Sequence, residues 1–130
     1  MNESLPITIN ITRLSCYNLS PDEVVLLEFL LFKQNYFGAF SWFYYSQRRM
    51  ITELKIKRSR LEKILSTFKD MGFLNVRIGL STSTNNSMSY FMVDFSILSK
   101  DSVLSQIIDK DSYFYDEMQN ALIEAVKRPF

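Results

Sequence analysis

The sequence predicts an α+β fold, and three features of the chain support this class. A long apolar segment, residues 21–37, has the start and stop signals of a helix. A second segment, around residues 61–68, carries apolar residues at helical spacing. Two strand-like runs, residues 74–80 and 88–95, flank a polar stretch and predict a β-hairpin. With 130 residues, the chain has room for one hydrophobic core but not for two.

The first predicted elements are a strand and the long helix. Residues 7–12, ITINIT, alternate isoleucine with polar residues, as in a half-buried strand. Ser20 can cap the helix, Pro21 sits at its first position, and Glu23 completes a capping box. Gly38 can end it. Because this helix is apolar nearly all round, we expect it to be central and buried.

An aromatic strand and two helices follow. Residues 40–46, FSWFYYS, are aromatic and strand-like. Ser46 can cap a short helix over residues 47–54. A tight connection at residues 55–57 leads into the most regular helix of the chain. Its apolar stripe recurs at i, i+3, i+4 and i+7 and consists of Leu61, Ile64, Leu65 and Phe68.

The hairpin and a helical tail complete the prediction. Gly72 suits a left-handed cap after the regular helix, and the polar stretch STSTNNS joins the two strands of the hairpin. Residues 99–130 predict one or two further helices. They extend the domain formed by residues 1–98, either as part of it or as a dimerisation element. The apolar stripe of the last helix consists of Phe114, Met118, Ala121, Leu122, Ala125 and Val126.

The composition argues against catalysis, metal binding and membrane insertion. The chain has no histidine, which removes the commonest general base and metal ligand, and its three glycines form no phosphate loop. The longest apolar run, VVLLEFLLF, is far shorter than the ~18 residues of a membrane span. MNESLPITIN lacks the apolar region of a secretory signal, and the single Cys16 fits a reducing compartment. We expect a cytoplasmic, non-enzymatic protein without metal, cofactor or membrane partner.

Positive charge is concentrated in one part of this nearly neutral chain. Residues 48–77 contain nine basic and three acidic side chains, so this segment carries +6 and the rest of the chain −5, for a net charge of +1. A solvated helix face normally mixes signs, whereas a phosphate-binding surface concentrates positive charge. The alternative is a solubilising surface with a chance excess of basic residues.

The order of helix, strand, helix, turn, helix and hairpin resembles that of winged helix-turn-helix proteins. Residues 45–74 are similar to the helix-turn-helix core of bacterial winged-helix transcription regulators and phage or plasmid replication initiators. The similarity spans roughly residues 20–95 and implies a winged helix-turn-helix with an extra C-terminal helix or helices. Lys55 and Lys57 stand where such proteins usually have glycine and a serine or threonine cap. The matching positions are Ser46, Gln47, Leu54, Leu61, Leu65, Met71, Gly72, Phe73 and Leu74.

On this fold the basic segment predicts double-stranded DNA binding, most naturally in transcription regulation. The N-terminal part of the second helix enters the major groove, and its candidate base-reading residues are Arg58, Ser59, Arg60, Glu62 and Lys63. Candidate phosphate contacts come from the preceding helix and the turn and are Arg48, Arg49, Lys55 and Lys57. Replication initiation or plasmid maintenance is an alternative use. A protein–protein interaction module is the alternative from another class.

Two apolar features admit alternative interpretations. The aromatic run at residues 40–46 could stack single-stranded nucleic acid, but Phe43 and Tyr45 lie on the opposite strand face from Trp42 and Tyr44. Core packing and an interface are therefore preferred. The last helix predicts a homodimer, because an exposed apolar stripe is rarely tolerated in a monomer; the alternative is that it folds back on the first helix. The candidate dimerisation residues are Phe114, Met118, Leu122 and Val126.

Overall fold

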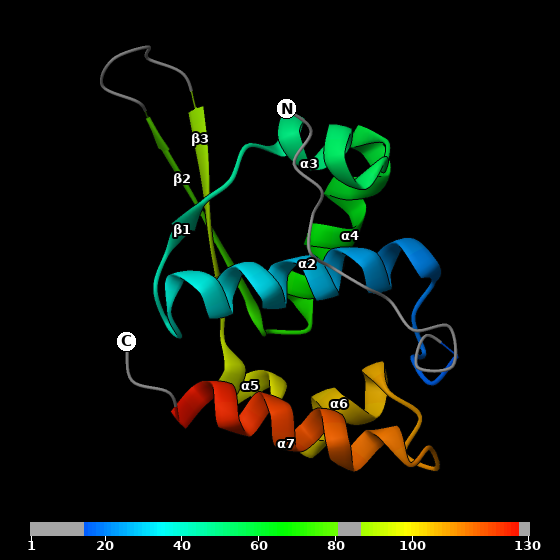
Figure 1. Ribbon diagram of the computed structural model, residues 1–130. Helices are drawn as coiled ribbons and strands as arrows, with labels where there is room; N and C mark the ends of the chain where they lie inside the picture. Colours follow the sequence, from blue (N-terminus) through cyan, green and yellow to red (C-terminus); the bar gives the residue numbers. More distant parts are fainter. Residues whose placement is uncertain (1–14, 81–86, 128–130) are drawn as a thin grey trace.

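The computed structural model describes residues 15–80 and 87–127, which form an α+β fold of six helices and one three-stranded antiparallel sheet (Figure 1). The predicted strand at residues 7–12 and most of the predicted loop, residues 81–86, lie outside the described residues. The elements in chain order are α2 (Pro21–Phe37), β1 (Phe43–Tyr44), α3 (Gln47–Leu54), α4 (Arg58–Asp70), β2 (Leu74–Leu80), β3 (Ser87–Val93), α5 (Phe95–Leu98), α6 (Asp101–Ile107) and α7 (Phe114–Lys127).

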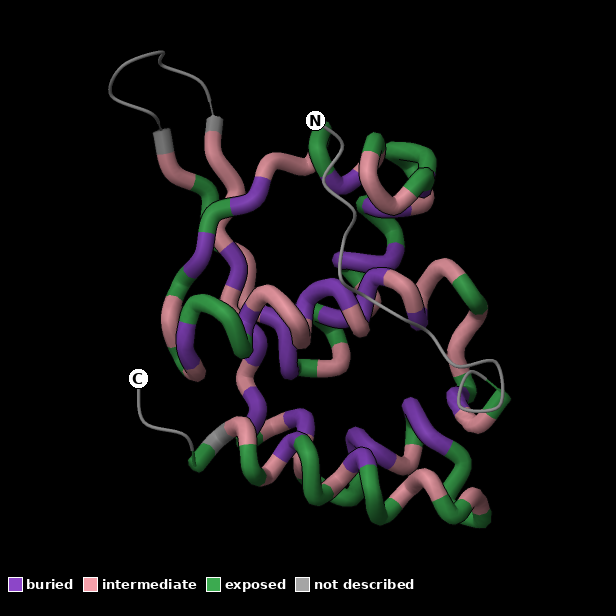
Figure 2. The backbone as a smooth tube through the Cα atoms, in the orientation of Figure 1, coloured by how far each residue is buried: buried purple, intermediate pink, exposed green. Residues whose placement is uncertain are grey.

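Helix α2 lies at the centre of the molecule, which confirms the prediction from its apolar sequence. In Figure 1 it runs between the sheet with α3 and α4 on one side and the layer of α5, α6 and α7 on the other. The Ser20 backbone N–H donates to Glu23 Oε1 at 2.9 Å, as in a capping box. The helix ends at Gly38, whose φ of 108° suits glycine. Much of its backbone is coloured as buried (purple) in Figure 2. Its buried residues are Val24, Leu26, Leu27, Phe29, Leu30 and Gln34.

Helices α3 and α4 also begin and end where the sequence predicts. Ser46 Oγ accepts a hydrogen bond from the Arg49 backbone N–H at 3.2 Å and caps α3. After α4, Gly72 has a φ of 93° and provides the predicted left-handed cap. The predicted stripe of α4 is buried in full and consists of Leu61, Ile64, Leu65 and Phe68.

The sheet has the strand order β1–β3–β2, with the β2–β3 hairpin as its main part. Phe43 and Phe91 are buried, whereas Tyr44 and Arg77 are exposed. Because side chains alternate along a strand, the sheet has an inner face toward the helices and an outer face away from them. One row of the register on the inner face is Phe43, Phe91 and Val76, and the next row, on the outer face, is Tyr44, Tyr90 and Arg77.

Two strands are shorter than predicted, each for a local reason. Of residues 40–46, only Phe43–Tyr44 pair as β1, because the Ser41 N–H donates to the Gly38 carbonyl and continues the turn after α2. Strand β3 ends at Val93 rather than at residue 95. The Asp94 carboxylate accepts the backbone N–H of Ser96 at 3.0 Å and thereby caps α5.

Helices α5, α6 and α7 form a second layer, below α2 in Figure 1. Backbone hydrogen bonds tie the segment before α2 to the segment after α6. The Asn18 N–H donates to the Ile107 carbonyl at 2.5 Å, and the Asp109 N–H donates to the Cys16 carbonyl at 2.7 Å. These bonds fasten the segment before α2 to the C-terminal helical layer.

The apolar stripe of α7 packs within its own chain. Met118 and Leu122 are buried and border a small core space together with side chains of α2. The prediction that these two residues form a dimer surface is therefore corrected in favour of the fold-back alternative. Phe114 is half-buried, and the side chain of Val126 lies outside the described structure.

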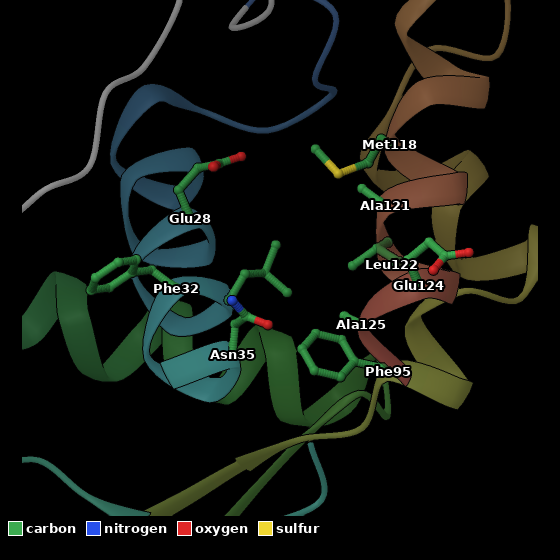
Figure 3. Close-up of a pocket in the computed structure, with 10 residues that line it drawn as sticks. Glu28, Phe32, Asn35, Phe95, Met118, Ala121, Leu122, Glu124 and Ala125 are labelled. Atoms are coloured by element: carbon green, nitrogen blue, oxygen red, sulfur yellow. The ribbon is translucent and has the colours of Figure 1, made fainter. Parts of the chain in front are cut away.

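An open groove of about 370 Å³ remains beside this contact, between α2 and α7 (Figure 3). Met118 reaches from α7 toward α2, and the carboxylate of Glu28 points into the same gap. The other side chains that line the groove are mainly apolar and include Leu31, Phe95 and Ala125. Met118 and Leu122 also line this groove, so they border both the core space and the open gap between the two helices.

Gln34 is a polar side chain buried at the junction of α2 and the sheet. Its Nε2 donates to the carbonyls of Gly38 at 2.6 Å and Ser41 at 2.8 Å. Its Oε1 accepts the backbone N–H of Val93 at 2.7 Å. A buried amide is stable only when hydrogen-bonded, and here it joins α2, the turn before β1 and β3.

Replacing Gln34 with Leu should lower the free energy of unfolding by about 3 kcal/mol, because the Val93 N–H and the Ser41 carbonyl lose their partner in the core. Urea denaturation measures the change. The control is Gln106→Leu on the exposed side of α6, which should alter stability by no more than about 0.5 kcal/mol. Equal unfolding midpoints for the two variants would contradict the role of Gln34.

Candidate nucleic-acid interface

Eight of the nine predicted DNA contacts are exposed, on α3, the turn after it and the first half of α4. Five of these eight are basic side chains that form no ion pair with another described residue. Since their charges are not neutralised by neighbouring carboxylates in this part of the chain, they create a positive surface. These residues are Arg48, Lys55, Lys57, Arg58 and Lys63.

Arg49, a further predicted phosphate contact, is exposed but held by its own helix. Its Nη2 lies 2.9 Å from Glu53 Oε2, and its guanidinium carbon lies 4.7 Å from the centroid of the Tyr45 ring. The pair with Glu53 cancels much of its charge. Arg49 therefore adds less positive potential to the surface than the five basic residues that form no ion pair with another described residue.

Arg60 turns away from the other predicted base-reading residues. Its Nε lies 2.6 Å from Asp22 Oδ2, and its Nη2 donates to Ser20 Oγ at 2.8 Å. The guanidinium holds the pKa of the Asp22 carboxyl well below its usual range. Arg60 lies on the flank of α4 beside the N-terminus of α2, where it joins the two helices. Its guanidinium is therefore less available to a ligand than the side chains of Arg58 and Lys63.

The opposite flank of α4 borders two shallow hollows beside the sheet. One, of about 290 Å³, has Arg48 and Arg58 on its rim and strand residues Tyr44 and Ser89 opposite. The other, of about 150 Å³, lies between α4 and β2 and is bordered by Glu62, Ser66, Lys69 and Val76. Gln47 borders both hollows. Together they form a concave strip along α4, beside the hairpin.

The first turn of α4 adds backbone donors to this surface. Lys57 occupies the N-cap position and its side chain forms no capping hydrogen bond. The first N–H groups of a helix lack intrahelical partners, and the helix dipole makes this end attractive to anions. Lys57 and Arg58 flank these donors with positive charge, which favours a phosphate at this position.

Gln47, Lys69 and Ser89 border the site but were not among the predicted contacts. Gln47 belongs to the positions that match the resemblance, and Lys69 is one of the nine basic residues of segment 48–77. Ser89 reaches the site because β3 pairs with β2 and β1 beside α4. The sequence pattern of the hairpin shows which residues alternate, but the helix that faces them is set by tertiary packing.

Within residues 15–80 and 87–127, no helix has the length and apolar character needed to cross a membrane. In the same residues, no group of three or more Cys, Asp or Glu side chains is placed to hold a metal ion.

Comparison of the chain with protein-family models, curated proteins and solved structures finds no match.

Replacing Asp22 with Asn should lower stability at pH 7, and the difference from wild type should become smaller as the pH falls below about 4. Asp22 has a lowered pKa in the folded chain, so its pair with Arg60 stabilises the fold above the unfolded pKa of about 3.9 and loses this effect as pH falls further. Urea unfolding from pH 7 to about pH 2 measures the difference. Asp111→Asn, at an exposed loop position, is the control. A difference for Asp22→Asn that stays constant with pH would contradict this account.

Replacing Lys55 with Gly should raise the free energy of unfolding by about 0.5–1 kcal/mol. Lys55 has a φ of 58°, and the left-handed region is costly for a residue with a Cβ. Lys57→Gly is the matched control, because Lys57 has a φ of −64° and gains nothing from glycine. Thermal unfolding should rank Lys55→Gly above wild type and Lys57→Gly below it. The reverse order is incompatible with strain at Lys55.

Proposed function

We propose that this chain is a winged helix-turn-helix protein that binds double-stranded DNA and has no enzymatic activity. The α3–turn–α4 unit, followed by the β2–β3 hairpin, supplies the elements of this fold. The observation that carries the proposal is the set of exposed basic side chains on that unit, which have no acidic partner among the described residues. This is the charge pattern of a surface that binds phosphates.

In the proposed complex, α4 enters the major groove with its N-terminal half. A B-DNA major groove accommodates one α-helix. Arg58 and Lys63 would donate to guanine O6 or N7, and Glu62 would accept from cytosine N4. Ser59 can bond to either kind of base edge. Arg60 is left out of this set because Asp22 and Ser20 already bind its guanidinium.

Phosphate contacts would come from the residues around the start of α4. Lys55 and Lys57 lie in the turn, and Arg48 lies on α3 beside the hollow that α4 borders. Such contacts fix the register of a protein on DNA without selecting a sequence. Transcription regulation is the use we propose. Dimerisation through α7 is not part of it, since Met118 and Leu122 are buried within the chain.

The test is a salt titration of binding to labelled duplex DNA, followed by fluorescence anisotropy. Each phosphate contact that is neutralised releases counterions, so affinity should fall steeply as salt rises. Lys57→Ala should weaken binding to all duplexes similarly and reduce the salt slope by about 1. Lys100→Ala, an exposed lysine before α6, is the control and should leave both quantities unchanged.

Two results would count against the proposal. Duplex DNA that fails to bind at low salt removes the function altogether. Binding that weakens equally in Lys57→Ala and Lys100→Ala shows a diffuse charge effect rather than a site on α4.

A further inference from the structure

The outer face of the sheet carries a cluster of aromatic and sulfur-containing side chains around one arginine. The register places Tyr44, Tyr90 and Arg77 in a single row across all three strands. Trp42 precedes β1 on the same side and remains 37% exposed, and Tyr44 is 43% exposed. We call this set the outer sheet face; it consists of Trp42, Tyr44, Arg77, Met88, Tyr90 and Met92.

The rings of this face are close enough to act together. The Tyr44 and Tyr90 ring centroids are 5.8 Å apart. The Arg77 guanidinium carbon lies 4.7 Å from the Trp42 ring centroid and 5.7 Å from that of Tyr90. Gly79 leaves space for this arrangement, because a Cβ there would come within 3.1 Å of Tyr90 Cε2. Strand β3 thus adds the Tyr90 ring, and β2 adds the Arg77 guanidinium, to the face of the sheet that carries Trp42 and Tyr44.

The charge of the outer sheet face favours an anionic partner. Arg77 is its one charged side chain. The nearest acid along β3 is Asp94, which lies beyond the strand and accepts hydrogen bonds from the backbone N–H groups of Ser96 and Ile97. The face also continues toward the basic surface, since Tyr44 borders the hollow that contains Arg48 and Arg58. Rings combined with cations and without carboxylates are typical of surfaces that stack nucleic-acid bases.

We propose that the outer sheet face is a second nucleic-acid site, which binds a short stretch of single-stranded DNA. Unpaired bases stack on Tyr44 and Tyr90 and against the Trp42–Arg77 pair, while Arg77 and the nearby Arg48 attract the phosphates. A duplex cannot use this site in the same way, because its bases are already stacked on one another. The proposal depends on the duplex-binding function in one respect only, namely that the outer sheet face adjoins the basic surface to which that function is assigned.

Trp42 provides a direct probe, because it is the only tryptophan of the chain. At low salt, an oligothymidylate of about 12 nucleotides should quench its fluorescence in a saturable way. Added salt should reverse the quenching, since phosphate contacts are lost. Absence of any quenching, together with unchanged anisotropy of a labelled oligothymidylate, would overturn the proposal.

Variants locate the binding, with anisotropy of the labelled oligothymidylate as the readout. Tyr44→Leu and Arg77→Gln should each weaken binding about fivefold or more. Tyr113→Leu removes a ring that is 76% exposed between α6 and α7 and should have no effect. Circular dichroism confirms that each variant is folded. Equal affinities for wild type, Tyr44→Leu and Arg77→Gln would contradict a site on this face.

A further variant separates this proposal from the duplex function. Arg58→Ala combined with Lys63→Ala should weaken duplex binding but retain oligothymidylate binding. Oligothymidylate binding that is lost in this double variant belongs to α4 and overturns the second site. Light scattering that shows a dimer broken by Tyr44→Glu also overturns it, by making the face a protein interface. If oligothymidylate binds as proposed while duplex DNA does not, the duplex function alone fails.

Discussion

The structure depends on the need to cover α2 on all sides. A helix that is apolar nearly all round is stable only when other elements surround it. The sheet and α4 cover one side of α2, and α5, α6 and α7 cover the other (Figure 1). Gln34 fixes where the sheet sits on this helix, because its amide binds the turn before β1 and the backbone of β3. The hairpin is therefore held on α2 by hydrogen bonds of a buried residue that is not part of the proposed DNA surface.

The two flanks of α4 have different tasks. One flank, with Arg60, is tied to the start of α2 through Asp22 and Ser20. The other borders the hollows beside the sheet, where Arg58 lies on the rim. Basic residues of similar appearance in the sequence thus divide into one that holds two helices together and several whose charge is available to a ligand. The proposed function relies on the second group.

Local signals predicted much of the fold. Ser20, Ser46, Gly38 and Gly72 mark helix ends in the sequence, and each one does so in the structure. The prediction fails where tertiary contacts decide. The ion pair of Arg60 with Asp22 joins residues far apart in the chain, so the helical periodicity of the sequence does not predict it.

The same limit applies to the C-terminal layer and to the outer sheet face. The stripe of α7 is apolar in either interpretation, and only the fold shows that Met118 and Leu122 pack within their own chain. The alternation in residues 40–46 correctly separates Tyr44 from Phe43. It cannot show that Tyr90 and Arg77 complete the face of Tyr44, because this depends on strand register.

The central claim is that duplex DNA binds at the start of α4 and the adjoining hollows. Backbone amide chemical shifts, recorded during a titration with a short DNA duplex, test it most directly. The account predicts shift changes concentrated in residues 46–49 and 55–66, with α6 and α7 little affected. Changes confined to α5, α6 and α7, or none at low salt, would contradict it.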